Sequence, residues 1–184
     1  MKRKRRLIKH LISLIILIFF KFNLKATPKN NKTKVLTNKI FFKHRISKEH
    51  PERPERIKYI IDYIKESKLN YLLEYISLHS DDVLENWIRE IHTKKHINNL
   101  KKKEPIAHNV SSAAIEICLR GIDMIINNKT ENVFCAVRPP GHHALNTGKE
   151  EGFCYYNHIA ITAKYLQKKY KIYKILIVDW DYHH

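Results

Sequence analysis

Two short polar clusters near the end of the 184-residue chain contain side chains that could bind a metal ion and transfer protons. The first cluster, residues 179–184 (DWDYHH), directly follows an apolar run. In an extended chain alternate side chains point to the same face, so Asp179, Asp181 and His183 would share one side. Zinc accepts carboxylate and imidazole ligands, and two of them with a third from elsewhere leave a coordination position for water. The alternative is a polar strand end that is rich in histidine without any function.

The second cluster is the adjacent pair His142 and His143, within the loop sequence RPPGHH of residues 138–143. The ordinary pKa of histidine is close to neutrality, so a pair can divide the roles of general base and general acid. Each ring needs a partner that fixes its tautomer and orientation, and Asp179 is a candidate for one ring. The alternative is a pair of surface histidines in a loop of glycine and proline.

The elements around both clusters follow an α/β pattern. Residues 132–137 (NVFCAV) and 174–179 (KILIVD) are apolar runs that predict two strands. Nearly unbroken runs of this kind are typical of parallel strands buried on both faces. Between them a helix is expected to start at a cap residue, Asn157, and to run to Lys169. A strand–helix–strand unit is right-handed and binds ligands beyond the carboxyl ends of its strands, where both clusters lie.

Three more elements are expected upstream. A first strand starts near Lys34 and includes residues 35–36 and 40–42. Pro51 and Pro54 keep residues 50–54 extended. A helix starting at Glu55 is predicted because isoleucines recur at residues 57, 60, 61 and 64, and another is predicted for residues 110–126.

The net charge of +17 is concentrated at the start of the chain. Residues 1–48 hold 15 of the 35 Lys and Arg residues and no acidic residue, whereas the remainder carries 20 basic and 18 acidic residues. A nearly neutral body does not favour direct nucleic-acid binding. We therefore divide the chain into a basic leader, residues 1–33, and a body, residues 34–184.

The leader has the composition of a targeting segment. Five basic residues at positions 2–6 precede an apolar run at residues 11–20, which has the length of a signal-peptide core and is short for a membrane span. We expect a signal peptide that directs the protein to the secretory pathway or to a membrane-bounded organelle, with membrane contact only through residues 7–20. The alternatives are a short signal anchor, or a buried apolar segment in a protein of the nucleus or cytoplasm.

Cysteines offer no metal or disulfide pattern. Cys118, Cys135 and Cys154 are an odd number without a C-x-x-C spacing, which excludes the usual cysteine zinc site. We expect all three to be buried small apolar residues.

Four segments resemble, in order, signatures of the histone deacetylase superfamily. They are residues 50–57 (HPERPERI), 134–144 (FCAVRPPGHHA), 152–157 (GFCYYN) and 179–184 (DWDYHH). The first resembles the opening motif of the class II-like branch, which includes bacterial relatives. The resemblance implies an α/β fold of the three-layer arginase/deacetylase type with a mainly parallel sheet. Residues 34–184 would then be the N-terminal portion of a deacetylase domain.

The resemblance also implies a role for each matching residue. Asp181 and His183 would be zinc ligands. His142 and His143 would be the paired catalytic histidines, with His143 donating a proton to the leaving amine. Asp179 would support His142 and contribute to a monovalent-cation site, for example for K⁺.

A substrate tunnel is implied as well, with Phe153 as one wall and Gly152 beside it. The expected function is zinc-dependent hydrolysis of acetyl-lysine in histones or other proteins, or of an acetylpolyamine. The family has a third zinc ligand and an oxyanion-binding Tyr or His further along than residue 184, so we expect these 184 residues alone to be inactive and marginally stable. The alternatives are a non-catalytic interaction module with the front half of the fold, and a binuclear hydrolase of the arginase type.

Overall fold

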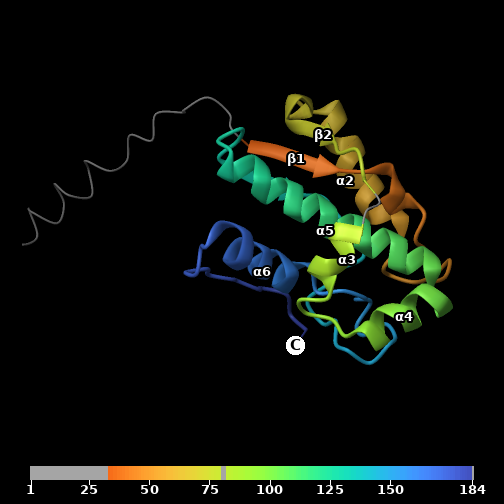
Figure 1. The fold of residues 1–184 in the computed structure, drawn as a ribbon. Coiled ribbons are helices and arrows are strands. Elements are labelled where there is room, and N and C mark those ends of the chain that lie inside the picture. Colours follow the sequence, from red (N-terminus) through yellow and green to blue (C-terminus); the bar gives the residue numbers. More distant parts are fainter. Residues whose placement is uncertain (1–32, 80–81, 184) are drawn as a thin grey trace, which may run out of the picture. The chain divides into compact units, whose positions relative to one another are not determined.

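The computed structural model describes residues 33–79 and 82–183 (Figure 1). Within them three parallel strands form one sheet in the order β2-β1-β3. Strand β1 spans Thr33–Thr37, β2 spans Leu73–Tyr75 and β3 spans Asn132–Cys135. The central strand is β1, since Val35 pairs with Leu73 on one side and with Phe134 on the other. The predicted leader, including residues 7–20, lies outside the described residues except for Thr33, the first residue of β1.

Helices account for most of the remaining structure. The α-helices are α2 (Pro54–Glu66), α3 (Asp82–Ile88), α4 (Lys94–Lys103), α5 (Pro105–Ile126) and α6 (His158–Tyr170), and the 3-10 helices are η1 (Lys39–Phe42) and η2 (Asn70–Leu72). Helices α2 and α5 each begin at a proline. The first N–H groups of a helix have no acceptor within the helix, so the N–H that proline lacks costs no hydrogen bond there. Both predicted upstream helices are confirmed, α5 starting five residues earlier than residue 110. Among the described residues no helix has the length and apolar content needed to cross a membrane.

Two groups of buried apolar side chains hold these elements together. The first joins the sheet to α2 and α5, with Leu36, Ile61 and Ile117 among its members. The second joins α3, α4, α5 and α6 and includes Tyr156 and Ile161. Because α5 contributes to both groups, it connects the sheet to the helix that follows the histidine pair.

The predicted first strand is only partly correct. Strand β1 ends at Thr37, and residues 39–42 form η1 instead of continuing the strand. The Asn38 side chain accepts a hydrogen bond from the Ile40 N–H at 2.8 Å and so caps η1. It also donates to the Ile76 carbonyl at 2.7 Å. A side chain that bonds nearby backbone groups competes with a ladder, which explains why the strand stops here.

The strand predicted for residues 174–179 is wrong. Residues 171–183 contain no helix or strand, and Leu176 and Val178 are 87% and 66% exposed. A strand needs ladder hydrogen bonds to a neighbouring strand, and none of the described strands pairs with this segment. Apolar composition signals burial but does not supply a partner, so the predicted right-handed strand–helix–strand unit is also not formed in the described residues.

Candidate functional site

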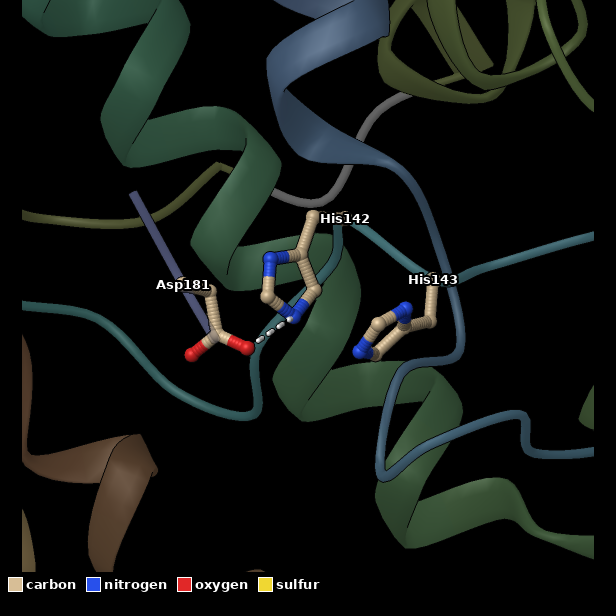
Figure 2. A group of neighbouring side chains, drawn as sticks. All are labelled: His142, His143 and Asp181. Atoms are coloured by element: carbon tan, nitrogen blue, oxygen red, sulfur yellow. Dashed lines mark ion pairs between the residues drawn. The ribbon is translucent and has the colours of Figure 1, made fainter. Parts of the chain in front are cut away.

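His142, His143 and Asp181 converge although they come from two separate segments (Figure 2). One potential ligand atom of each residue lies within 4.8 Å of the others. The two imidazole rings are 4.0 Å apart between centroids, and His142 Nε2 lies 4.0 Å from Asp181 Oδ2. The rings of two residues that are adjacent in the sequence thus lie side by side.

Asp179 lies against the other nitrogen of His142, with 3.1 Å between Nδ1 and Asp179 Oδ2. A carboxylate accepts, so in the neutral ring the proton sits on Nδ1 and donates to Asp179. The other ring nitrogen of His142, Nε2, is then free to accept a proton, and it lies 4.0 Å from Asp181 Oδ2. A contact of this kind fixes the tautomer and the orientation of a catalytic or metal-binding histidine.

Asp181 and His183 are also in direct contact. His183 Nδ1 is 3.1 Å from Asp181 Oδ2, and the His183 backbone N–H donates to the same oxygen at 2.9 Å. Donation from the His183 backbone and ring lowers the pKa of the Asp181 carboxyl below its usual value. The Asp181 backbone N–H in turn donates to Asp179 Oδ1 at 3.0 Å. These local bonds, rather than the alternation of an extended strand, bring the three side chains together.

The donor set suits a zinc ion by ligand type. Imidazole nitrogen and carboxylate oxygen are both zinc ligands, and Asp181 Oδ2 lies near nitrogens of both His142 and His183. The sequence predicted Asp181 and His183 as the ligands. In the described residues, a group of three side chains with ligand atoms within 4.8 Å of one another is formed by Asp181 and the two adjacent histidines.

Gly141 allows the loop to approach helix α6. A Cβ built on Gly141 would lie 2.1 Å from His158 Nδ1 and 2.5 Å from the Tyr156 carbonyl oxygen, so no side chain fits there. Asn157 holds the next residue: its Nδ2 donates to the His142 carbonyl at 3.3 Å, while its Oδ1 accepts from the Ala160 N–H at 2.9 Å. The predicted helix cap at Asn157 is confirmed, and the same side chain also holds the histidine loop.

Gly152 and Phe153 form a turn with unusual backbone conformations. Gly152 has a φ of +52°, and a Cβ there would lie 2.6 Å from His143 Cδ2. Phe153 has a φ of +70°, which is rare for a residue with a bulky side chain and stores on the order of 1–3 kcal/mol of strain. The Phe153 ring lies edge-on to His50, with 4.6 Å between centroids. Backbone hydrogen bonds in both directions between Glu151 and Cys154, at 2.9 and 2.8 Å, fix the turn.

Most residues of the site line one cavity of about 930 Å³. Six of the seven predicted site residues line it, and the seventh, Asp179, contacts His142. The lining residues from the predicted set are His142, His143, Gly152, Phe153, Asp181 and His183. Pro51, Glu52 and Arg56 from the opening motif also line the cavity, although the sequence assigned them no role.

His92 is a further residue, to which the sequence assigned no role in the site. It is buried, and its Nε2 accepts a hydrogen bond from the Asn157 backbone N–H at 2.9 Å. Burial, followed by the neighbouring His96, lowers the pKa of His92 to about 4. A neutral His92 therefore supports the residue that caps α6 and holds His142. No local pattern could have identified it, because its partner is 65 positions away.

Cysteines play no part in the cavity. All three are free, and Cys118 and Cys154 are buried as expected, whereas Cys135 is half-buried. Burial raises the pKa of the Cys154 thiol to about 11, which makes it a poor nucleophile at neutral pH.

The sequence of this chain was compared with known protein families to identify the class to which the fold and the site belong. Residues 50–184 match the histone deacetylase domain family. The chain therefore belongs to the histone deacetylase family, and the resemblance inferred from the motifs is confirmed.

Individual relatives agree with this assignment. A probable deacetylase of Archaeoglobus fulgidus is 33% identical over 170 residues, which cover 83% of this chain and 45% of that protein. The polyamine deacetylase HDAC10 of Rattus norvegicus is 36% identical over 95 residues, covering 52% of this chain and 16% of that protein. The crystal structure of the HDA15 HD domain superimposes with a TM-score of 0.73 at 25% identity, covering 84% of this chain and 48% of that chain. The predicted fold class is thus confirmed, and the chain spans less than half the length of each of these three relatives.

Proposed function

We propose that this protein is a zinc-dependent deacylase that hydrolyses the acetyl amide of lysine side chains in histones or other proteins. The observation that carries the proposal is the convergence of three histidines and Asp181 on one cavity, with Asp179 in contact with one of the histidines. Family membership supports hydrolysis of the deacetylase type. The metal and the substrate are inferred from the site.

Asp181 and His183 would hold the zinc ion. When bound, zinc polarises an amide carbonyl and lowers the pKa of a coordinated water towards neutrality. His142, whose Nδ1 faces Asp179 at 3.1 Å, presents Nε2 as the base for the water proton. His143, 4.0 Å away between ring centroids, would donate a proton to the leaving amine. Asp179 would also contribute to a K⁺ site, as the family resemblance implies.

Gly152 and Phe153 would receive the acyl-lysine side chain. The stem of lysine is a chain of methylene groups that packs favourably on an aromatic ring. The Phe153 ring and His143 line the same cavity, and the absence of a side chain on Gly152 leaves room for the His143 ring. This places an apolar wall beside the groups proposed to do the chemistry.

An acetylpolyamine is a second candidate substrate, for which Glu151 provides a specific reason. This acidic residue lines the same cavity beside Gly152 and Phe153. A carboxylate there would attract the second ammonium group of an acetylated diamine. The relative from Rattus norvegicus is named a polyamine deacetylase.

The 184 residues contribute two proposed zinc ligands, whereas catalytic zinc sites have three protein ligands. We therefore expect hydrolysis by this chain alone to be too slow to detect, and the function is tested by binding. Isothermal titration would compare an Nε-acetyl-lysine peptide, the same peptide with free lysine, and an acetylated diamine, each with and without Zn²⁺.

The proposal expects Zn²⁺-dependent binding of the acetylated peptide and little binding of the free-lysine peptide. Asp181→Asn should weaken Zn²⁺ binding at least tenfold, roughly the effect of losing a ligand contact. Asp62→Asn is a matched control, because both carboxylates are 42% exposed and Asp62 does not line the cavity. Equal Zn²⁺ affinity of both variants would contradict the metal site. Stronger binding of the acetylated diamine would select the second substrate, and measurable acetate release would overturn the expectation of inactivity.

A further inference from the structure

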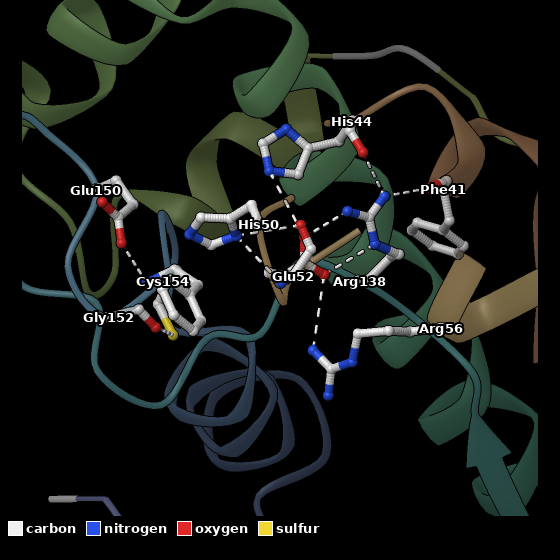
Figure 3. A network of polar contacts seen from close by, with 10 residues as sticks. Phe41, His44, His50, Glu52, Arg56, Arg138, Glu150, Gly152 and Cys154 are labelled. Atoms are coloured by element: carbon white, nitrogen blue, oxygen red, sulfur yellow. Dashed lines mark hydrogen bonds and ion pairs between the residues drawn. The ribbon is translucent and has the colours of Figure 1, made fainter. Parts of the chain in front are cut away.

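Arg138, the first residue of the histidine loop, is almost completely buried and makes polar contacts to three other segments (Figure 3). Its Nε donates to Glu52 Oε1 at 2.8 Å, and its Nη2 donates to Glu52 Oε2. Its Nη1 donates to the backbone carbonyls of Phe41 and of His44, the latter at 2.6 Å. One guanidinium group thus ties the loop after β3 to the end of η1, to His44 and to the segment before α2.

Glu52 is the only acidic partner of this guanidinium among the described residues, and its side chain is 1% exposed. Burying two charges is costly unless they are paired and their remaining hydrogen-bonding groups are satisfied. A two-point contact between a planar guanidinium and a carboxylate meets that condition and also fixes the orientation of both groups. Burial, followed by the charge of Arg138, lowers the pKa of His44, which favours the neutral ring beside the pair.

The link from Arg138 to the catalytic pair is short and stiff. Pro139, Pro140 and Gly141 are the only residues between Arg138 and His142. The two proline rings fix φ, which removes most of the freedom of this connection. At its far end Gly141 packs against α6, and Asn157 holds the His142 carbonyl at 3.3 Å. The loop is therefore fixed at both ends, by the ion pair on one side and by the start of α6 on the other.

We propose that Glu52 and Arg138 are positioning residues that set the orientation of His142 and His143 through the loop backbone. This role rests on the proposed function only in taking the two histidines as the reacting groups. The opening motif then has a role in the site, because Glu52 helps to place the proton-transfer residues through Arg138, which lies 86 positions away. An apolar pair of equal volume could fill the space, but it could not make the four hydrogen bonds by which Arg138 is held to Glu52, Phe41 and His44.

The test measures the ring signals of His142 and His143 by ¹H–¹³C NMR in the metal-free protein, and Zn²⁺ affinity by isothermal titration. Glu52→Gln removes the negative charge at constant size. Arg138→Lys keeps the positive charge but loses the planar guanidinium group that contacts both carboxylate oxygens of Glu52. Glu55→Gln is the matched control, because Glu55 lies three residues from Glu52 and pairs with Arg45 at the surface. His142→Asn and His143→Asn assign the signals.

The proposal expects the ring signals of both histidines to shift or broaden in Glu52→Gln and Arg138→Lys, while the far-UV circular dichroism spectrum remains that of the parent. Zn²⁺ affinity should change little, because the proposed ligands Asp181 and His183 lie outside the loop that the pair holds. Glu55→Gln should behave as the parent. Ring signals that match the parent in both variants would overturn the proposal.

Two outcomes separate this inference from other failures. If the parent binds no Zn²⁺, the proposed metal centre fails, and the ring signals alone decide whether the pair positions the histidines. If the single variants do not fold, the double variant Glu52→Leu/Arg138→Met replaces the pair by apolar groups, a change that buried pairs often tolerate. Ring signals that shift in the folded double variant support positioning, and unchanged signals contradict it.

Discussion

Lowering the pH from 7 to 5 should destabilise the folded chain through His92. This side chain is 2% exposed, and its Nε2 accepts the Asn157 N–H at 2.9 Å. A proton on Nε2 would face another N–H, and the charged ring would lie unsolvated beside His96, with 4.9 Å between ring centroids. Burial and His96 accordingly lower the pKa of His92 from 6.5 to about 4.

The size of the effect follows from this pKa difference. Below pH 6.5 the unfolded chain binds a proton at His92 that the folded chain does not bind until about pH 4, so stability falls as the pH falls through this window. At about 1.4 kcal/mol per pH unit, the full loss is about 3 kcal/mol, of which about 2 kcal/mol has occurred by pH 5. Because domain stabilities are on the order of 5–15 kcal/mol, a loss of this size is measurable.

Urea unfolding at pH 7 and at pH 5, followed by far-UV circular dichroism, measures the loss. The pKa values of His108 and His158 are also lowered to about 4 by burial, so the parent should lose more than His92 alone accounts for. His92→Gln keeps a hydrogen-bond acceptor and removes the titration, and it should lose about 2 kcal/mol less between the two pH values. His79→Gln, at a side chain that is 61% exposed, is the control and should retain the parent's pH dependence. An unchanged pH dependence in His92→Gln would refute the reasoning.

Three substitutions test the loop and its supports. Gly141→Ala places a Cβ 2.1 Å from His158 Nδ1 and should cost about 1–3 kcal/mol of unfolding free energy in urea, so parent-like stability would contradict the close contact. Asn157→Ala removes the α6 cap and should cost about 1 kcal/mol; it should also shift the His142 ring signal, and an unmoved signal would mean that the 3.3 Å contact to the His142 carbonyl does not hold the loop. Gly152→Ala combines a left-handed backbone with a Cβ 2.6 Å from His143 Cδ2, so NMR should show a displaced His143 ring, with Gly121→Ala on α5 as a control that leaves the ring unchanged.

Local patterns were sufficient for α2, α5 and α6, whereas α3 and α4 were not predicted. Isoleucines spaced at three and four residues define α2, and the position of α6 follows from Asn157 and the basic residues at its end. These features act within one or two turns of the chain, where side-chain and backbone groups are neighbours in any environment. The histidine pair and the DWDYHH segment could likewise be recognised because residue type alone limits which chemistry a cluster can perform.

Pairing between strands could not be read in the same way. The apolar run at residues 174–178 has the composition of a buried strand, yet most of its side chains are exposed and no described strand pairs with it. A ladder needs partners from distant parts of the chain, which composition does not specify. Asn38 similarly ended β1 through bonds to Ile40 and to the distant Ile76.

The sequence by itself determined the family, the α/β class, most helix positions and the set of residues available for chemistry, because these depend on residue type and short spacing. Only the tertiary structure decided how those residues meet. It placed His142 between Asp179 and Asp181, and it joined Glu52 to Arg138 across 86 positions. Buried charged and polar groups are stable only when they are paired with a hydrogen-bonding or oppositely charged partner. When that partner is far away in the sequence, only the fold determines which residue it is.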